Sequence, residues 1–282
     1  MTTDDAARRP SGVASAPPSF ARRHAWIGVL VVGAVLFLAV ERTMVATGDP
    51  NFVPSSILLG AAIVPAAFLT FVYGRRLPYD VPAPVVATAA FLGGVIGTVV
   101  AGTLEYDAQR DLGFLPMAAV GLIEETSKLL IPLAVLIFFR RYRTAADGLL
   151  VGVAAGAGFA ALETMGYAFV TLLQSKGSLI ATVDVLLLRG IMSPAGHMAW
   201  TGIAAAALFA AAESHWRGRA IGRFIAAYLL AVALHTLWDS QSSLIGTAIV
   251  AIVSLAALGW TVHRVARSAG VPGRHGRRAA VR

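Results

Sequence analysis

The sequence contains no cysteine and few charged residues, and both deficits restrict what the protein can be. Without cysteine, disulfide bonds and thiolate metal ligands are excluded. Charged residues make up only 13% of the 282 residues and hydrophobic ones 57%, whereas soluble domains carry roughly 25% charged residues. A chain of this length could bury a large core, but it lacks the residues for a polar surface. The composition therefore indicates an integral membrane protein.

The apolar runs identify the class of membrane protein. They continue over about 18–25 residues, the length of a helix that crosses a bilayer, and the short alternating strands of a membrane barrel are missing. We expect an all-α polytopic fold with about eight transmembrane helices. The expected spans are roughly 25–41, 56–73, 83–104, 116–139, 148–173, 185–212, 220–240 and 242–263.

The basic residues are distributed unequally between the two sets of alternate connections. Of the 23 Lys and Arg residues, 18 lie in the tails and in the connections on the same side, three lie on the other side, and two lie within spans. Cytoplasmic loops are enriched in Lys and Arg, so both termini are predicted to be cytoplasmic. The net charge of +8 then reflects topology, and the expected partner of the basic tails is the lipid bilayer rather than a nucleic acid.

Composition also predicts the domain organisation. Residues 1–23 are rich in Pro, Ser and Ala and should form a disordered cytoplasmic tail. Residues 24–264 should form a single transmembrane helical domain, and residues 265–282 a basic cytoplasmic tail.

Ionisable residues interrupt the apolar run GLIEETSKLL, where Glu124, Glu125 and Lys128 lie within one span. A Lys or Asp near the centre of a membrane helix costs about 2.5–3.5 kcal/mol, and Glu should be similar. Glu124 and Lys128, four residues apart, could form an internal ion pair, which would leave Glu125 unexplained.

Three later spans carry ionisable groups as well. The segment GFAALETMGY contains Glu163, LLLRGIMSPAGHMAW contains Arg189 and His197, and ALHTLWDS contains His235 and Asp239. Intramembrane ionisable residues are functional candidates by default. Their depth along alternating helices allows one polar cavity, reached more easily from outside. Arg189 could face it or extend toward the interface, and His235 with Asp239 could simply close a helix end.

Glu105 and Asp147, in contrast, are expected in loops or at helix ends, where charge costs little, and receive no role.

A carboxylate near imidazoles in a dry pocket suits hydrolysis. One of the paired glutamates could act as general base for water, and a histidine or a metal could stabilise an oxyanion. Glu163, His197 and His235 would suit a three-ligand Zn²⁺ with an open fourth position, although no HExxH motif is present. No organic cofactor is expected.

Four motifs resemble those of the PrsW family of membrane proteases. EETSK at 124–128 is similar to the family's EExxK, Phe159–Glu163 to FxxxE, Arg189–His197 to an Arg-then-His segment, and His235–Asp239 to an HxxWD-like motif. One departure is Thr164, where family members commonly have Asn.

This resemblance, which covers roughly residues 115–240, implies an intramembrane protease that cleaves a membrane protein near the outer face. In the family's best-known role, the substrate is a membrane-bound anti-sigma factor, and its first cleavage starts regulated proteolysis. The resemblance implies catalytic roles for the residues Glu124, Glu125, Glu163, His197 and His235, with Lys128, Arg189 and Asp239 in support. It also implies that Zn²⁺ is the metal to consider.

Three alternatives remain open at this point. A proton-coupled transporter would use similar intramembrane residues, but the halves show no repeat and the first three spans no interior charge. A CAAX-type prenyl-protein endopeptidase would need a cavity on the cytoplasmic side. An inactive scaffold could bind membrane peptides in the same groove.

Overall fold

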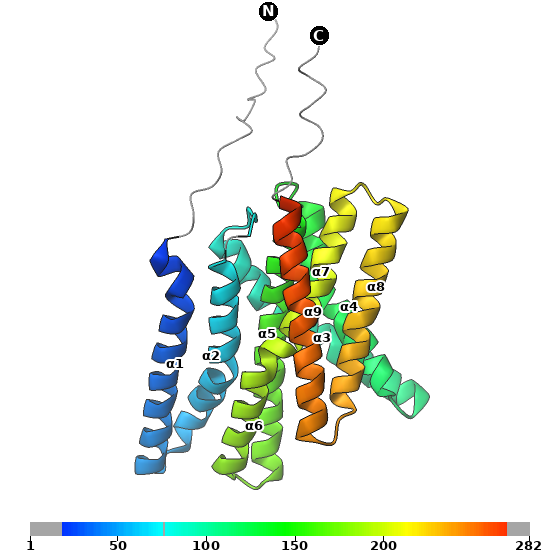
Figure 1. Ribbon diagram of the computed structural model, residues 1–282. Helices are drawn as coiled ribbons and strands as arrows, with labels where there is room; N and C mark the ends of the chain where they lie inside the picture. The colour runs from blue at the N-terminus through cyan, green and yellow to red at the C-terminus, as the bar shows by residue number, and fades with distance from the viewer. Residues whose placement is uncertain (1–18, 76, 270–282) are drawn as a thin grey trace, which may run out of the picture.

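The computed structural model describes residues 19–75 and 77–269, and the regular structure of this part of the chain is helical throughout (Figure 1). The helices are α1 (Phe20–Thr47), η1 (Pro50–Phe52), α2 (Val53–Tyr73), α3 (Ala83–Leu112), α4 (Met117–Phe138), α5 (Ala145–Gln174), α6 (Leu179–Met192), η2 (Ser193–Ala195), α7 (His197–Glu213), α8 (Gly218–Asp239) and α9 (Leu244–Ala269).

The helices bear out the prediction of a multi-pass membrane protein. Seven helical segments of the described chain are long and apolar enough to cross a bilayer, and α6, η2 and α7 form one of them. Helix α4 has 22 residues and adds an eighth segment of spanning length despite its three charged side chains. The start of α1 and the end of α9 lie at the same end of the bundle, as an even number of crossings requires (Figure 1). That this end faces the cytoplasm stays a prediction.

Several boundaries differ from the expected ones. Helix α1 begins at Phe20, where the Ser19 hydroxyl accepts a hydrogen bond from the backbone N–H of Arg22, so residues 20–23 are helical rather than part of a tail. Helix α9 likewise takes in residues 265–269. The remaining parts of the two expected tails, 1–18 and 270–282, lie outside the described residues.

The expected span 185–212 is two helices joined by a 3-10 turn. Pro194 lies in this turn, and Gly196, whose backbone (φ −101°, ψ −126°) is neither helical nor extended, leads into α7. Because proline lacks the N–H that an uninterrupted helix needs, the break falls where the sequence places Pro194. As a result His197 is the first residue of α7.

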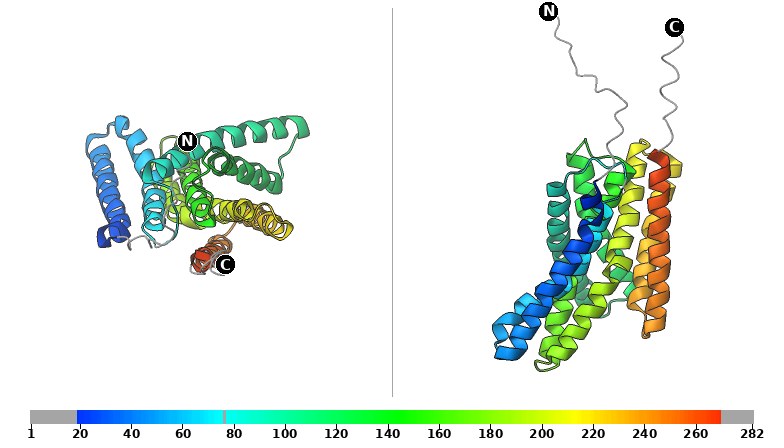
Figure 2. Two further views of the ribbon diagram at one scale, coloured as in Figure 1. Left: turned by 90° about the horizontal axis from the view of Figure 1, so that it is seen from above. Right: turned by 60° about the vertical axis from the view of Figure 1, so that its left-hand side comes forward.

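Helix α5 is the central element of the bundle, and seen along the bundle axis α1 lies at one edge (Figure 2). Glycines four residues apart let α5 approach α7 closely. A Cβ atom at Gly148 would lie 2.6 Å from the Ala205 carbonyl oxygen, and one at Gly152 would lie 2.5 Å from the Thr201 carbonyl oxygen. Small residues at this spacing permit such contact between membrane helices, so the glycines of α5 form a packing face against α7.

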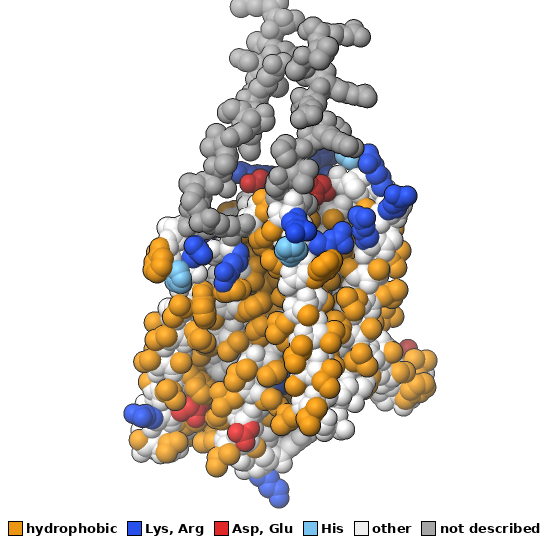
Figure 3. Space-filling view, in the orientation of Figure 1, with side chains coloured by type: hydrophobic (Ala, Val, Ile, Leu, Met, Phe, Trp, Pro, Cys, Tyr) orange, Lys and Arg blue, Asp and Glu red, His pale blue; other side chains and the backbone are white. Residues whose placement is uncertain are grey.

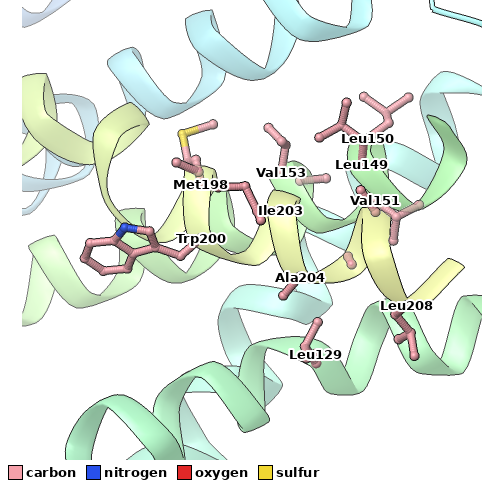
Figure 4. Close-up of a cluster of buried hydrophobic side chains, with 14 of the residues drawn as sticks. Leu129, Leu149, Leu150, Val151, Val153, Met198, Trp200, Ile203, Ala204 and Leu208 are labelled. Atoms are coloured by element: carbon pink, nitrogen blue, oxygen red, sulfur yellow. The ribbon is translucent and has the colours of Figure 1, made fainter. Parts of the chain in front are cut away.

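Apolar side chains from α5 and α7 fill the space beside this contact (Figure 4). Leu149, Val153 and Met198 are fully buried there. The outer flanks of the bundle are covered by exposed hydrophobic side chains, whereas Lys and Arg gather at the end where the chain begins and ends (Figure 3). This arrangement suits a surface in contact with lipid. The internal packing also fixes the positions of α5 and α7 relative to each other, and both helices carry residues of the candidate site.

Candidate active site

The three charged residues of α4 form one buried cluster. The Lys128 ammonium lies 3.0 Å from Glu124 Oε2 and 2.8 Å from Glu125 Oε1, and its side chain is fully buried. Glu124 and Lys128 form the ion pair that their spacing allows, and Glu125 joins it because residues three and four apart share a helix face. One lysine thus compensates two carboxylates, which explains how α4 tolerates three charges.

His197 connects this cluster to α5. Its Nδ1 atom lies 2.6 Å from Lys128 Nζ and its Nε2 atom lies 2.7 Å from Glu163 Oε2. Since an ammonium group can only donate, Nδ1 must accept from Lys128, and Nε2 carries the hydrogen donated to Glu163. The tautomer of His197 is therefore determined by its two neighbours.

Arg189 faces inward and does not extend toward the interface. Its Nη2 atom forms an ion pair with Glu163 Oε2 at 2.6 Å, and its guanidinium lies over the Tyr167 ring at 3.9 Å. The Nε atom is buried and has no hydrogen-bond acceptor among the described residues. Glu163 thus contacts Arg189 of α6 and His197 of α7, and Arg189 retains an unused donor.

His235 is held between carboxylates on both sides. Its Nδ1 atom lies 2.9 Å from Glu125 Oε1, while Nε2 lies 3.1 Å from Asp239 Oδ2 and 3.5 Å from Glu124 Oε2. The ring also stacks on Trp200, with 4.8 Å between centroids. These contacts fix the ring orientation, so the contact with Asp239 across one helix turn does more than close the helix end.

A cavity of about 480 Å³ lies beside these groups. It is lined by the end of α3, the start of α4, the second half of α5, the end of α6, the start of α7, the end of α8 and the start of α9. These segments lie toward the end of the bundle opposite to the start of α1 and the end of α9 (Figure 1). The site residues on its wall are Glu124, Glu163, Arg189, His197 and Asp239.

The other expected site residues lie behind the cavity wall. Glu125 and Lys128 are completely buried, and His235 is 1% exposed. The structure therefore brings all eight expected residues into one connected set but separates those that border the cavity from those that support them. In particular, Glu124 of the adjacent pair borders the cavity and Glu125 does not.

Two residues that received no role in the sequence analysis are in unexpected places. Glu105 lies within α3 on the cavity wall, and its Oε1 atom is buried without a partner among the described residues. Asp147 is fully buried, where it forms a capping box with Thr144 and accepts from the backbone N–H of Asp80 at 2.7 Å. The expected position in a loop or at a helix end is wrong for Glu105, which lies inside α3, whereas Asp147 does lie at a helix end but is buried there. The signal for Glu105 was the absence of a helix stop before Gly113, which makes α3 longer than the expected span.

The compact group of possible metal donors differs from the expected one. Glu124, His197 and His235 each offer a donor atom within 4.8 Å of the others, so Glu124 takes the place expected for Glu163. Two imidazoles and one carboxylate with an open position are a known catalytic zinc set. Carboxylates commonly orient zinc-binding histidines, and Glu125 and Glu163 contact the two rings here.

One contact limits how a metal could bind. His197 Nδ1 has a single lone pair, which the Lys128 ammonium uses. A metal on this nitrogen must displace Lys128 Nζ, and one on Nε2 must displace Glu163. If a metal replaced one of these two partners of His197, the donor set would fit zinc in its residue types, its burial and its supporting contacts.

A comparison with known protein families gives a match that agrees with this geometry. A family model described as PrsW family intramembrane metalloprotease matches residues 81–262, which include α3 to α8, most of α9 and all eight expected site residues. The chain matches no curated protein and no solved structure.

Proposed function

Because the chain belongs to the PrsW family of intramembrane metalloproteases, we propose that it hydrolyses a peptide bond of a membrane protein in the cavity beside Glu124. One observation carries this proposal: the Glu124 carboxylate on the cavity wall lies together with two oriented imidazoles, His197 and His235, and the buried ammonium of Lys128. The excess of basic residues at the opposite end of the bundle favours cleavage near the outer face of the membrane.

Glu124 is proposed as the proton acceptor for the attacking water. Lys128 holds its Oε2 atom at 3.0 Å, while no hydrogen bond from a described residue reaches Oε1. A carboxylate held at one oxygen and free at the other can accept a proton from water without losing its position. Glu125, enclosed by Lys128 and His235, would keep these two side chains in place.

The donor Arg189 supports the step in which charge develops on the carbonyl oxygen. Its place on the cavity wall makes the Arg189 guanidinium a candidate for stabilising an oxyanion. The buried Nε hydrogen, which no described residue accepts, would have to turn toward the cavity to take part. Glu163 would keep the guanidinium oriented through the contact at 2.6 Å. A positive group aimed at developing negative charge contributes most in a site without water.

Zinc is the candidate metal, and Glu124, His197 and His235 would each hold it through one atom, so the second oxygen of Glu124 would stay free to accept the proton. When bound, it would polarise the substrate carbonyl and make its water more acidic. The chain's own part is to orient both rings through carboxylates and to exclude water behind the cavity. Trp200 contributes to this exclusion because it is fully buried against His235.

A single-span membrane protein of the anti-sigma-factor type is the proposed substrate. The site lies within the bundle, between helical segments of membrane-spanning length, so the scissile bond must reach it from a membrane-bound segment. A helix must first unwind, because its carbonyl groups are engaged in hydrogen bonds.

Cleavage of candidate single-span proteins in cells tests the proposal. Wild type is compared with Glu124→Gln, Glu125→Gln and His197→Ala at equal amounts in the membrane, and Asp111→Asn, whose side chain is 64% exposed, serves as the control. We expect product from wild type and the control and none from Glu124→Gln or His197→Ala. Cleavage that persists in both variants would contradict the proposed site, and an inactive wild type would favour the scaffold alternative.

A further inference from the structure

A second cavity, of about 370 Å³, lies at the other end of the bundle. Its walls come from the end of α2, the start of α5 and the second half of α9, and they share no residue with the proposed active site. Most of its lining is aliphatic or aromatic, and the one charged side chain is Arg75. Representative lining residues are Phe68, Phe71, Leu149, Val153, Leu255 and Leu258.

The described chain does not fill this space. Helices α2 and α9 stand on opposite sides of it without packing against each other closely. Water is a poor occupant, because a buried water needs two to four polar partners and these walls offer almost none. An apolar gap left empty would cost its walls their dispersion contacts. In a bilayer, a lipid acyl chain is the apolar group at hand.

The charged groups near this cavity are basic. The Arg75 guanidinium lies 3.6 Å from the centroid of the Phe71 ring, and the Arg23 backbone approaches Gly74. Burial and the neighbouring charge of Arg23 lower the pKa of Arg75. An arginine is still a cation at neutral pH, so Arg75 and Arg23 are two neighbouring positive charges. Neither arginine forms an ion pair with a carboxylate in the part of the chain that the structure describes.

We propose that this cavity binds one acyl chain of an anionic phospholipid, with the lipid phosphate on Arg75 and Arg23. An apolar slot that ends at Arg75, with Arg23 close to it in the fold and neither in an ion pair among the described residues, matches a molecule with a hydrocarbon chain and an anionic head. Basic pockets between helices on the cytoplasmic side of membrane proteins recognise such head groups. The lipid would connect α2 to α9 and contact α5, the helix that carries Glu163.

The test measures lipid binding to the full chain in detergent by native mass spectrometry. Phosphatidylglycerol and phosphatidylcholine with identical acyl chains are titrated against wild type and Arg75→Gln. Arg219→Gln, which removes an arginine of α8, is the matched control. We expect wild type and the control to prefer phosphatidylglycerol. Arg75→Gln should weaken its binding about fivefold, the contribution of one basic residue near an anionic surface, and leave phosphatidylcholine unaffected.

A second variant tests the acyl-chain slot. Gly259 borders the cavity, and a Cβ atom there would have open space around it, so Gly259→Phe should fold and fill the slot. Both lipids should then bind more weakly than to wild type. If a melting curve shows that this variant is unfolded, Leu255→Phe replaces it.

Two results would overturn the proposal: unchanged lipid preference in Arg75→Gln, or undiminished binding in the folded slot-filling variant. The readout involves no proteolysis, so it is independent of the proposed protease activity.

Discussion

Replacing Lys128 with methionine tests the electrostatic argument for the buried cluster. Methionine keeps most of the side-chain volume and removes the charge, so Glu124 and Glu125 lose the ammonium at 3.0 and 2.8 Å. At an effective dielectric constant of 20, each contact corresponds to about 5–6 kcal/mol of Coulomb attraction, which desolvation offsets in large part. Removing one partner of a buried pair typically costs about 3–5 kcal/mol.

We expect Lys128→Met to lower the free energy of unfolding by about 3 kcal/mol, the lower end of this range, because His235 still contacts Glu125. Reversible unfolding of the purified protein in mixed micelles measures the change. The double variant Lys128→Met/Glu125→Gln should regain part of the loss, because it removes one uncompensated carboxylate. Lys176→Met is the control, since Lys176 lies in an exposed loop and its replacement should change stability by less than about 0.5 kcal/mol.

A Lys128→Met variant as stable as the Lys176→Met control would refute the reasoning. So would strict additivity of the two changes in the double variant, because contacting charges must show coupling in a double-mutant cycle.

Three further predictions concern the metal, the helix packing and the cavity. Purified wild type should bind zinc in competition with a chelator, and His235→Ala should weaken this binding at least tenfold, whereas the control His263→Ala should not. Equal zinc affinities of wild type and His235→Ala would exclude the proposed donor set. Gly156→Ala should lower stability by about 1–3 kcal/mol, because its Cβ would overlap the α7 backbone, while Gly166→Ala on the same helix has open space and should be neutral or stabilising in thermal unfolding. Arg189→Gln should reduce the cleavage rate about 10–100-fold at equal protein amounts, and an unchanged rate would remove Arg189 from the proposed oxyanion site.

The helices and their order followed from sequence because a membrane helix satisfies its backbone hydrogen bonds locally. Hydropathy therefore located the spans, but the break before α7 was not predicted: Pro194 lies at the break, whereas Pro65 and Pro132 lie inside continuous helices. Contacts within one helix were equally accessible. Lys128 lies one turn from both glutamates, and His235 one turn from Asp239, so these pairs depend only on helix geometry.

The limits of the helices were less accessible, since they depend on caps and neighbours. The hydroxyl of Ser19 starts α1 before the apolar run begins, and α3 continues past its apolar part to Gly113, where the backbone becomes left-handed. Glu105 consequently lies in a helix and on the cavity wall.

Only the tertiary structure decided which side chains from different helices meet. The sequence by itself determined a polytopic membrane protein with ionisable residues in four consecutive spans. It could not show that Glu124, rather than Glu163, belongs to the compact group of possible metal donors with His197 and His235. That assignment depends on how each helix is rotated about its axis. The rotation of α5 and α7 is set by the interlocking of glycines with the facing backbone, a relation between distant segments that no local pattern contains.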